Sequence, residues 1–274
     1  MLNDITFGQY FSGNSIVHKL DPRVKILLLI FLIVLVFVTG NLVSLGLVTL
    51  FTAIIMVATE IPFKLYFKNI KVIIPIIIFT AILNIFYTTT GVLLTEFWII
   101  KIYSGGLLRA TYMAVRVLLL ILVSSVLTYT TTPNDLTDAI ERLLKPLKFI
   151  GLGEAVHTMS MMMTIALRFI PTLIEETNKI MNAQKARGAD LDSGGVITKI
   201  KALLPILIPL LISSVRRAYE LAEAMECRCY NGGKGRTRMK QLYLRLHDYS
   251  SIIICIVLLA SVILSNIFIG IGVI

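Results

Sequence analysis

The sequence has few charged residues for its length. Only 15% of its 274 residues are Asp, Glu, Lys or Arg, whereas soluble domains carry about 25%. Hydrophobic residues make up 57%, and many lie in uninterrupted apolar runs such as 26–38. A run of this kind has no polar face for water, which excludes an ordinary soluble domain and a disordered chain. The composition therefore predicts a protein that resides in a lipid bilayer.

Cysteines are scarce, and motifs for catalysis or metal binding are missing. Cys227, Cys229 and Cys255 do not have the spacing of a disulfide framework. Cys227-Arg228-Cys229 has no second pair of ligands nearby, so a zinc site is not indicated. There is no phosphate-binding loop, no H-E-x-x-H and no G-x-S-x-G, and Glu175-Glu176 lacks the arginine of the E-E-x-x-x-R protease pattern. We expect no cofactor and no enzymatic activity of the chain itself, ATP hydrolysis included.

The net charge of +10 could suggest a nucleic-acid partner. The basic residues, however, lie in loops beside apolar runs. This is the arrangement of membrane proteins, whose Lys and Arg residues remain in the cytoplasm. We therefore expect the lipid bilayer, and no nucleic acid, as a partner.

Five apolar stretches are long enough, or nearly so, to cross the membrane: 24–40, 42–58, 70–88, 107–129 and 250–272. Gly40-Asn41 is a turn signal that predicts a tight antiparallel hairpin of the first two spans. The loop 89–106 holds only two charged residues, as an external loop should. Basic residues precede the first span and separate the second from the third, which places both segments inside: Lys19, Arg23, Lys25, Lys64, Lys68 and Lys71. The N-terminus is then cytoplasmic and the C-terminus external.

Residues 130–249 contain 17 of the 26 Lys and Arg residues. Thr132-Pro133 indicates the start of an amphipathic helix. Two further apolar stretches, 155–174 and 202–215, are ambiguous, and Pro205 and Pro209 are expected to interrupt the second. If both crossed the membrane, the basic linker 175–201 would be external, against the charge rule, so we expect interfacial or packed helices.

The predicted fold is an all-α integral membrane protein with about five transmembrane helices and a cytoplasmic or interfacial helical coupling region. Its parts are a membrane domain with four spans (1–129), cytoplasmic coupling helices (130–249) and a last transmembrane helix (250–274).

Two arginines between small residues stand out in the coupling region. Ala186-Arg187-Gly188 closes a helical stretch from about Pro171, and Cys227-Arg228-Cys229 closes another that includes 216–226. One interpretation is capping, because a cation suits the last turn of a helix and Gly188 suits a left-handed C-cap. The other is docking, because small neighbours allow a guanidinium to reach a carboxylate in a narrow groove. Arg109 and Arg116 lie seven residues apart on one face of the fourth span, and charges at membrane depth are costly enough to be functional candidates. The simpler interpretation is that Arg109 reaches the outer interface and Arg116 bonds carbonyls or a neighbouring subunit.

The chain resembles the transmembrane T components of energy-coupling factor transporters, which are ABC-type importers of vitamins and trace metals. The resemblance covers nearly the whole chain. The segments that carry it are 167–173 (LRFIPTL), 184–190 (QKARGAD), 216–218 (RRA) and 223–226 (EAME). It implies two ABC ATPase partners and a substrate-binding S component. It also implies that Arg187 and Arg228, with Ala186, Gly188, Cys227 and Cys229, dock into the two ATPases. Cysteines stand at the second site where the family more often has Ala and Gly.

The resemblance also implies that the S component rests on the coupling helices. Flexible methionines at 159, 161, 162 and 163 suit contact with several partners, although ordinary lipid or core contact is an equal interpretation. The residues expected at this contact are Met159, Met161, Met162, Met163, Leu207 and Leu211. A stand-alone secondary transporter is the alternative, but the first four spans offer only Asn84, Arg116 and Pro75 for a midplane site. A membrane enzyme is not indicated, because the sequence has no set of residues arranged for catalysis.

Overall fold

The computed structural model describes residues 10–97, 100–189, 195–232 and 243–269. The described chain is helical apart from one short β-hairpin. It divides into two compact units. The first, called the membrane unit, contains the described residues up to Leu136 and those from 243 onward. The second, called the α7–α8 unit, contains the described residues from Thr137 to 232.

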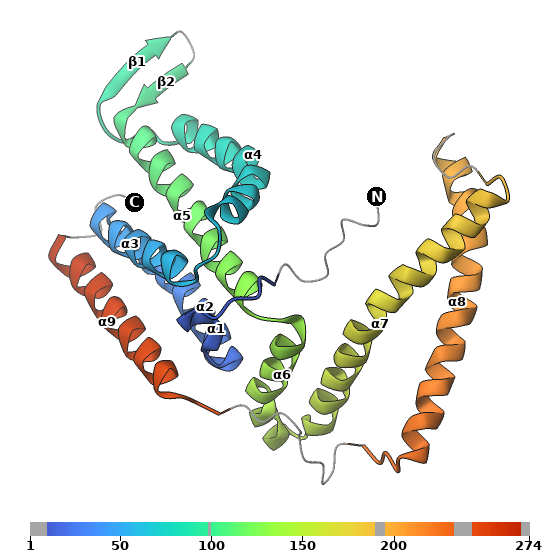
Figure 1. Ribbon diagram of the computed structural model, residues 1–274. Coiled ribbons are helices and arrows are strands. Elements are labelled where there is room, and N and C mark those ends of the chain that lie inside the picture. Colours follow the sequence, from blue (N-terminus) through green and yellow to red (C-terminus); the bar gives the residue numbers. More distant parts are fainter. Residues whose placement is uncertain (1–9, 98–99, 190–194, 233–242, 270–274) are drawn as a thin grey trace. The chain divides into compact units, whose positions relative to one another are not determined.

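The membrane unit contains six helices and the hairpin within its described residues (Figure 1). Their bounds are α1 Ile16–Lys19, α2 Pro22–Val38, α3 Leu42–Ala58, α4 Phe63–Tyr87, β1 Leu93–Phe97, β2 Ile100–Tyr103, α5 Ser104–Thr130 and α9 Leu246–Ile269. By length and composition α4, α5 and α9 can each cross a bilayer, and α3 is a shorter apolar helix. The prediction of an all-α integral membrane protein is confirmed.

Several boundaries differ from those predicted. Helix α4 begins at Phe63 rather than at residue 70, so Lys64, Lys68 and Lys71 lie on its first turns and not in a loop. The segment expected to be a plain loop between the third and fourth spans contains the antiparallel pair β1 and β2. Residues 270–272 of the fifth predicted span lie outside the described residues. Apolar content predicts the buried or lipid-facing part of a helix, but polar turns extend it beyond that part.

Helix α5 is the centre of the membrane unit, with α2, α3 and α4 packed against it. The largest buried cluster joins α2, α3, α5 and α9 around Leu35, Val48, Tyr112, Leu119 and Val262. Helices α2 and α3 are joined by the short turn predicted at residues 40–41. They pack mainly on α5 and α9, however, rather than on each other as a tight hairpin would. Most other large apolar side chains of these helices are exposed, as lipid contact requires.

Buried polar groups tie the α2–α3 turn to α5. The guanidinium of Arg116 donates to the carbonyl oxygen of Thr39 at 2.8 Å and to the hydroxyl of Tyr112 at 3.0 Å. The Tyr112 hydroxyl in turn donates to the same carbonyl at 2.6 Å. Arg116 therefore bonds a carbonyl, as predicted, and Arg109 is only half-buried.

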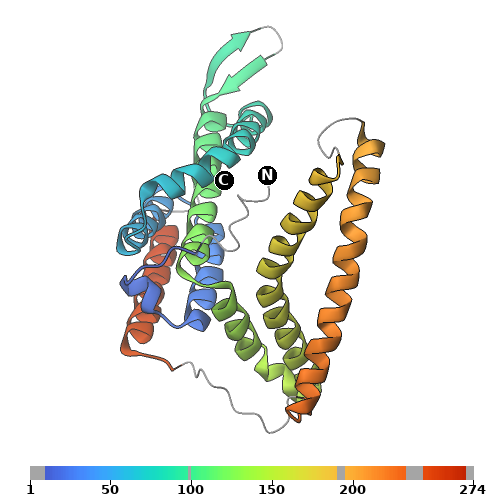
Figure 2. The ribbon, with the colours of Figure 1, turned by 45° about the vertical axis from the view of Figure 1, so that its right-hand side comes forward.

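Within its described residues, the α7–α8 unit consists of α6 (Pro133–Leu143) from Thr137 onward, a 3₁₀ turn and two long helices. Helix α6 starts where Thr132-Pro133 predicted, and the Thr132 hydroxyl accepts from the backbone N–H of Asp135. It is followed by the 3₁₀ turn Lys145–Ile150, then α7, Gly153–Ala186, and α8, Val196–Cys227. Figure 2 shows α7 and α8 side by side.

Both long helices contain prolines in their interior: a helical stretch was expected to begin at about Pro171, and Pro205 and Pro209 were expected to interrupt another. Pro171 lies inside α7, and Pro205 and Pro209 lie inside α8. The prediction that these prolines interrupt the second stretch is wrong. Pro205 and Pro209 are four residues apart, so their missing N–H donors fall on one helix face and the rest of the backbone ladder persists.

Candidate coupling site

The first arginine motif forms the C-terminal cap of α7. Ala186 is the last helical residue, Arg187 is the C-cap, and Gly188 has a left-handed backbone with φ of 87°. The N–H of Gly188 donates to the carbonyl of Lys185, and the N–H of Ala189 donates to that of Gln184, both at 3.0 Å. This pair of bonds is a Schellman motif. Asp190, the last residue of the 184–190 segment, lies outside the described residues.

The second motif ends α8 with the same geometry. Cys227 is the last helical residue, Arg228 is the C-cap, and Cys229 is left-handed with φ of 54°. The N–H of Cys229 donates to the carbonyl of Glu226 at 2.8 Å, and that of Tyr230 to Met225 at 3.0 Å. Cys229 therefore adopts the conformation that Gly188 adopts, although its side chain makes this conformation unfavourable.

The capping bonds of both helix ends are made by backbone groups, so neither guanidinium is needed to satisfy the last carbonyls. Arg187, Arg228 and their four small neighbours are all exposed. The predicted cap at Gly188 is thus present, and it leaves Arg187 available. Capping and exposure of the arginine are compatible, which the sequence alone did not establish.

Helices α7 and α8 run antiparallel and are joined by specific contacts. The Ser213 hydroxyl donates to the carboxylate of Glu176, and Arg217 forms an ion pair with the same carboxylate at 2.9 Å. Further along, the Tyr230 hydroxyl donates to the sulfur of Met161 at 2.9 Å. Along the helix pair, Arg228 is therefore level with Met161. From Met161 to Arg187, α7 rises about 39 Å, so the two arginine motifs are well separated.

A pocket of about 370 Å³ lies beside Arg228. Apart from Arg228, it is lined by Met161 and Ile165 of α7, by Leu221 and Met225 of α8, and by residues 229–232 that follow. Sequence reasoning missed this pocket because it depends on which part of α7 faces the end of α8. The spacing of Met225 and Tyr230 across the cap could have indicated a hydrophobic contact there.

The residues predicted to contact a membrane partner divide into two sets. Met161 is half-buried against Tyr230 and serves the α7–α8 contact. The others are exposed, with 68% of Met159 and 66% of Leu211 accessible. The exposed members of the set are Met159, Met162, Met163, Leu207 and Leu211. They leave a large apolar surface on both long helices.

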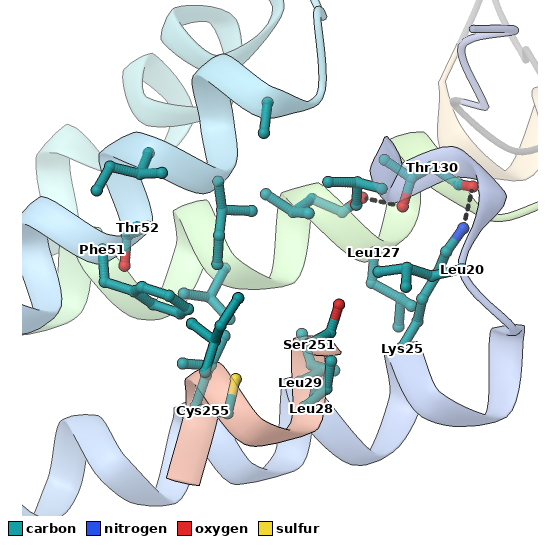
Figure 3. Close-up of a pocket in the computed structure, with 18 residues that line it drawn as sticks. Leu20, Lys25, Leu28, Leu29, Phe51, Thr52, Leu127, Thr130, Ser251 and Cys255 are labelled. Carbon is teal, nitrogen blue, oxygen red and sulfur yellow. Dashed lines mark hydrogen bonds between the residues drawn. The ribbon is translucent and has the colours of Figure 1, made fainter. Parts of the chain in front are cut away.

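A second pocket, of about 260 Å³, lies inside the membrane unit between α2, α3, α5 and α9 (Figure 3). Its lining is apolar except at a few positions, among them Lys25, Thr130 and Ser251. The Lys25 ammonium donates to the carbonyl of Thr130 at 2.9 Å at one end of the pocket. Among the described residues, no group of three His, Cys, Asp or Glu side chains is placed to hold a metal ion.

Long apolar helices, a buried core too small to cover them and a second unit with two long helices define a multi-pass helical membrane protein. Comparison with known proteins narrows this class. The family CbiQ, described as "Cobalt transport protein", matches residues 13–239. The energy-coupling factor transporter transmembrane protein EcfT of Clostridium kluyveri is 49% identical over 271 residues, which is 98% of this chain and 100% of that protein.

Two other EcfT proteins are similar over nearly as much of their length. That of Ruminiclostridium cellulolyticum is 52% identical over 242 residues, 88% of this chain and 90% of its own. That of Bacillus subtilis is 44% identical over 260 residues, 95% of this chain and 97% of its own. The chain belongs to the CbiQ/EcfT family of energy-coupling factor transporter transmembrane proteins, which confirms the resemblance.

Proposed function

We propose that this chain is the transmembrane coupling subunit of an ECF-type ABC importer. It transmits the motion of two ATPase subunits, driven by ATP, to a substrate-binding S component that takes up vitamins or other micronutrients. The observation that carries the proposal is the pair of equivalent helix caps, each presenting an exposed arginine between small residues.

Each cap is suited to docking. Because backbone bonds satisfy the helix end, the guanidinium is free to form two parallel hydrogen bonds with a carboxylate of the partner. The small side chains at 186, 188, 227 and 229 let the helix end enter a groove. Two similar sites about 39 Å apart along one rigid helix pair suit two similar subunits rather than one. The pocket beside Arg228 makes the second site distinct from the first.

The exposed apolar side chains of α7 and α8 are assigned to the S component. Met159, Met162 and Met163 can repack against different partners, and Leu207 and Leu211 extend the apolar surface on α8. Met161 contributes by holding the two helices together. ATP hydrolysis belongs to the ATPase subunits, and this subunit is non-catalytic.

The proposed layout is a membrane domain of four spans (1–129), coupling helices on the cytoplasmic side (130–249) and a last span (250–274) in the cell membrane. Two hydrogen bonds support termini on opposite sides of the membrane. The N–H of Phe11 donates to the carbonyl of Tyr129 at the end of α5. Near the C-terminal end of α9, the side-chain amide of Asn266 donates to the carbonyl of Val38. Val38 lies next to the α2–α3 turn. With positive loops inside, the N-terminus is cytoplasmic and the C-terminus external.

The test is charge reversal at both caps. Arg187→Glu combined with Arg228→Glu should abolish co-purification of the ATPases and ATP-dependent uptake, because like charges then face each other in the sockets. The protein should still insert in the membrane, since the membrane unit is unchanged. A matched control is Lys179→Glu with Arg216→Glu, which reverses two exposed charges on the same helices away from the caps.

Partners are identified by affinity purification of the tagged chain in mild detergent, followed by mass spectrometry. Two ATP-binding proteins and one small hydrophobic protein are expected with the wild-type chain and with the control. Recovery of the chain alone, or uptake by the double arginine variant, would contradict the proposal.

A further inference from the structure

The first helical turn of α2 forms hydrogen bonds with both segments that connect the membrane unit to the coupling region. The chain leaves the membrane unit after α5, which ends at Thr130, and returns to it before α9, which begins at Leu246. Residues 21–25 bond to both places. All of these contacts lie within the membrane unit.

On the outgoing side the contact is made by a buried lysine. The Lys25 ammonium donates to the carbonyl of Thr130 at 2.9 Å and to that of His18 at 3.2 Å. Lys25 is 7% exposed and Thr130 is 2% exposed. Figure 3 shows the lysine reaching from α2 to the end of α5. The last turn of α5 is therefore attached to the first turn of α2.

On the returning side the contact is made by a buried aspartate. Asp248, in the first turn of α9, is 1% exposed. One of its carboxylate oxygens accepts from the backbone N–H of Asp21 at 2.8 Å. The other accepts from the backbone N–H of Arg245 at 2.6 Å. One side chain thus joins the start of α9, the segment before it and the start of α2.

The two contacts are connected through a stiff element. Asp21 is the N-cap of α2, and its carboxylate accepts from the backbone N–H of Arg23 and from both Nε and Nη2 of the Arg23 guanidinium. The N–H of Lys25 donates to the carbonyl of Asp21 at 3.1 Å. A displacement of either connecting segment is therefore resisted by the same helical turn.

Packing alone does not account for these residues. Lysine and aspartate are rarely fully buried, and apolar side chains of similar size would fill the space at a lower desolvation cost. The carboxylates of Asp135, Asp21 and Asp248 interact favourably with the charge of Lys25. None of these four residues belongs to the two buried apolar clusters of the unit. The hydrogen bonds of the buried charged groups fix the relative positions of the segments, which apolar contacts alone leave adjustable.

We infer that Asp21, Lys25, Thr130 and Asp248 form an anchor through which motion of the coupling region reaches the membrane helices. The inference rests on the proposed function. Lys25 and Asp248 act as positioning residues: they hold the two connecting segments so that force on the segments moves α2, α5 and α9 together.

The experiment compares Lys25→Met and Asp248→Asn in the full transporter complex reconstituted in proteoliposomes. ATP hydrolysis and substrate uptake are measured on the same preparation. We expect hydrolysis to persist while the uptake per ATP hydrolysed falls about tenfold or more, because the lost bonds involve charged groups and are among the stronger ones. Lys25→Arg keeps the charge and donors and should restore part of the ratio.

The control is Tyr112→Phe, which removes the buried hydrogen bonds of the Tyr112 hydroxyl with Thr39 and Arg116 near the α2–α3 turn. It should lower stability without changing uptake per ATP, since it touches neither connecting segment. Should Lys25→Met fail to fold, Asp248→Asn carries the test: the amide has the same shape, but its NH2 group cannot accept from the N–H of Arg245, so the bond to the returning segment is lost. An unchanged ratio in a folded Asp248→Asn complex would overturn the anchor and leave the proposed function intact. A wild-type complex that binds no ATPase would overturn both.

Discussion

Gly188 and Cys229 occupy the same position in two equivalent caps, so substitutions there form a matched set. Both are left-handed, with φ of 87° and 54°. A residue with a Cβ pays about 1–2 kcal/mol for this conformation, and Gly does not. No atom lies within 4 Å of the position that a Cβ would take at Gly188, so backbone strain alone sets the effect there.

Gly188→Ala should destabilise the last turn of α7 by about 1 kcal/mol, after the lower entropy of the open chain offsets part of the strain. Cys229→Gly should stabilise the last turn of α8 by a similar amount. Cys229→Ala should change little, because both side chains have a Cβ. The expected signs are therefore opposite at two sites of the same geometry.

Hydrogen–deuterium exchange of the amides at 188–189 and 229–230 measures this local stability. A change of 1 kcal/mol corresponds to about fivefold in exchange rate. Cys227→Ala is the control, since Cys227 is helical and exposed and its substitution relieves no left-handed strain. Faster exchange in Cys229→Gly, or no change in Gly188→Ala, would refute the reasoning.

Two further predictions concern polar contacts. In the α7–α8 contact, a double-mutant cycle of Glu176→Gln and Arg217→Gln should give a coupling free energy of about 1 kcal/mol. This coupling should shrink in high salt, because the ion pair is only partly buried. Strictly additive effects of the two substitutions on thermal stability would contradict this. Near the N-terminus, burial lowers the pKa of His18 below its ordinary value of 6.5, and neutral His18 donates from Nε2 to the carbonyl of Phe11 at 2.9 Å. Its contribution to stability is therefore present above pH 6.5 and is lost as the pH falls through the lowered pKa. Exchange of amides 10–15, corrected for intrinsic rate, should accelerate between pH 7.5 and 5.5 in the wild type but not in His18→Gln, and equal acceleration in both would count against the role of His18.

Local patterns predicted much of the helical architecture. Continuous apolar runs predicted the membrane helices, because backbone groups in lipid must bond within the helix. Thr132-Pro133 predicted the start of α6, and Gly188 predicted the left-handed residue after α7. Each of these features depends on a few consecutive residues, so the sequence contains the information.

Other features were wrong or missed because they depend on residues distant in sequence. Pro205 and Pro209 were expected to interrupt a helix that continues through them, since packing along α7 supports α8. The pocket beside Arg228 exists because the end of α8 meets Met161. The left-handed Cys229 was not indicated by its residue type.

The sequence by itself determined that this protein resides in a lipid bilayer, the approximate place of its apolar helices, and its family. These follow from composition and from local motifs. Only the tertiary structure decided that the two arginine motifs are equivalent caps about 39 Å apart along one antiparallel pair. It alone brought Asp248 to Asp21 and Lys25 to Thr130 across more than a hundred residues of chain. Hydrogen bonds and buried charges between distant segments are set by how helices pack, and no local pattern records that.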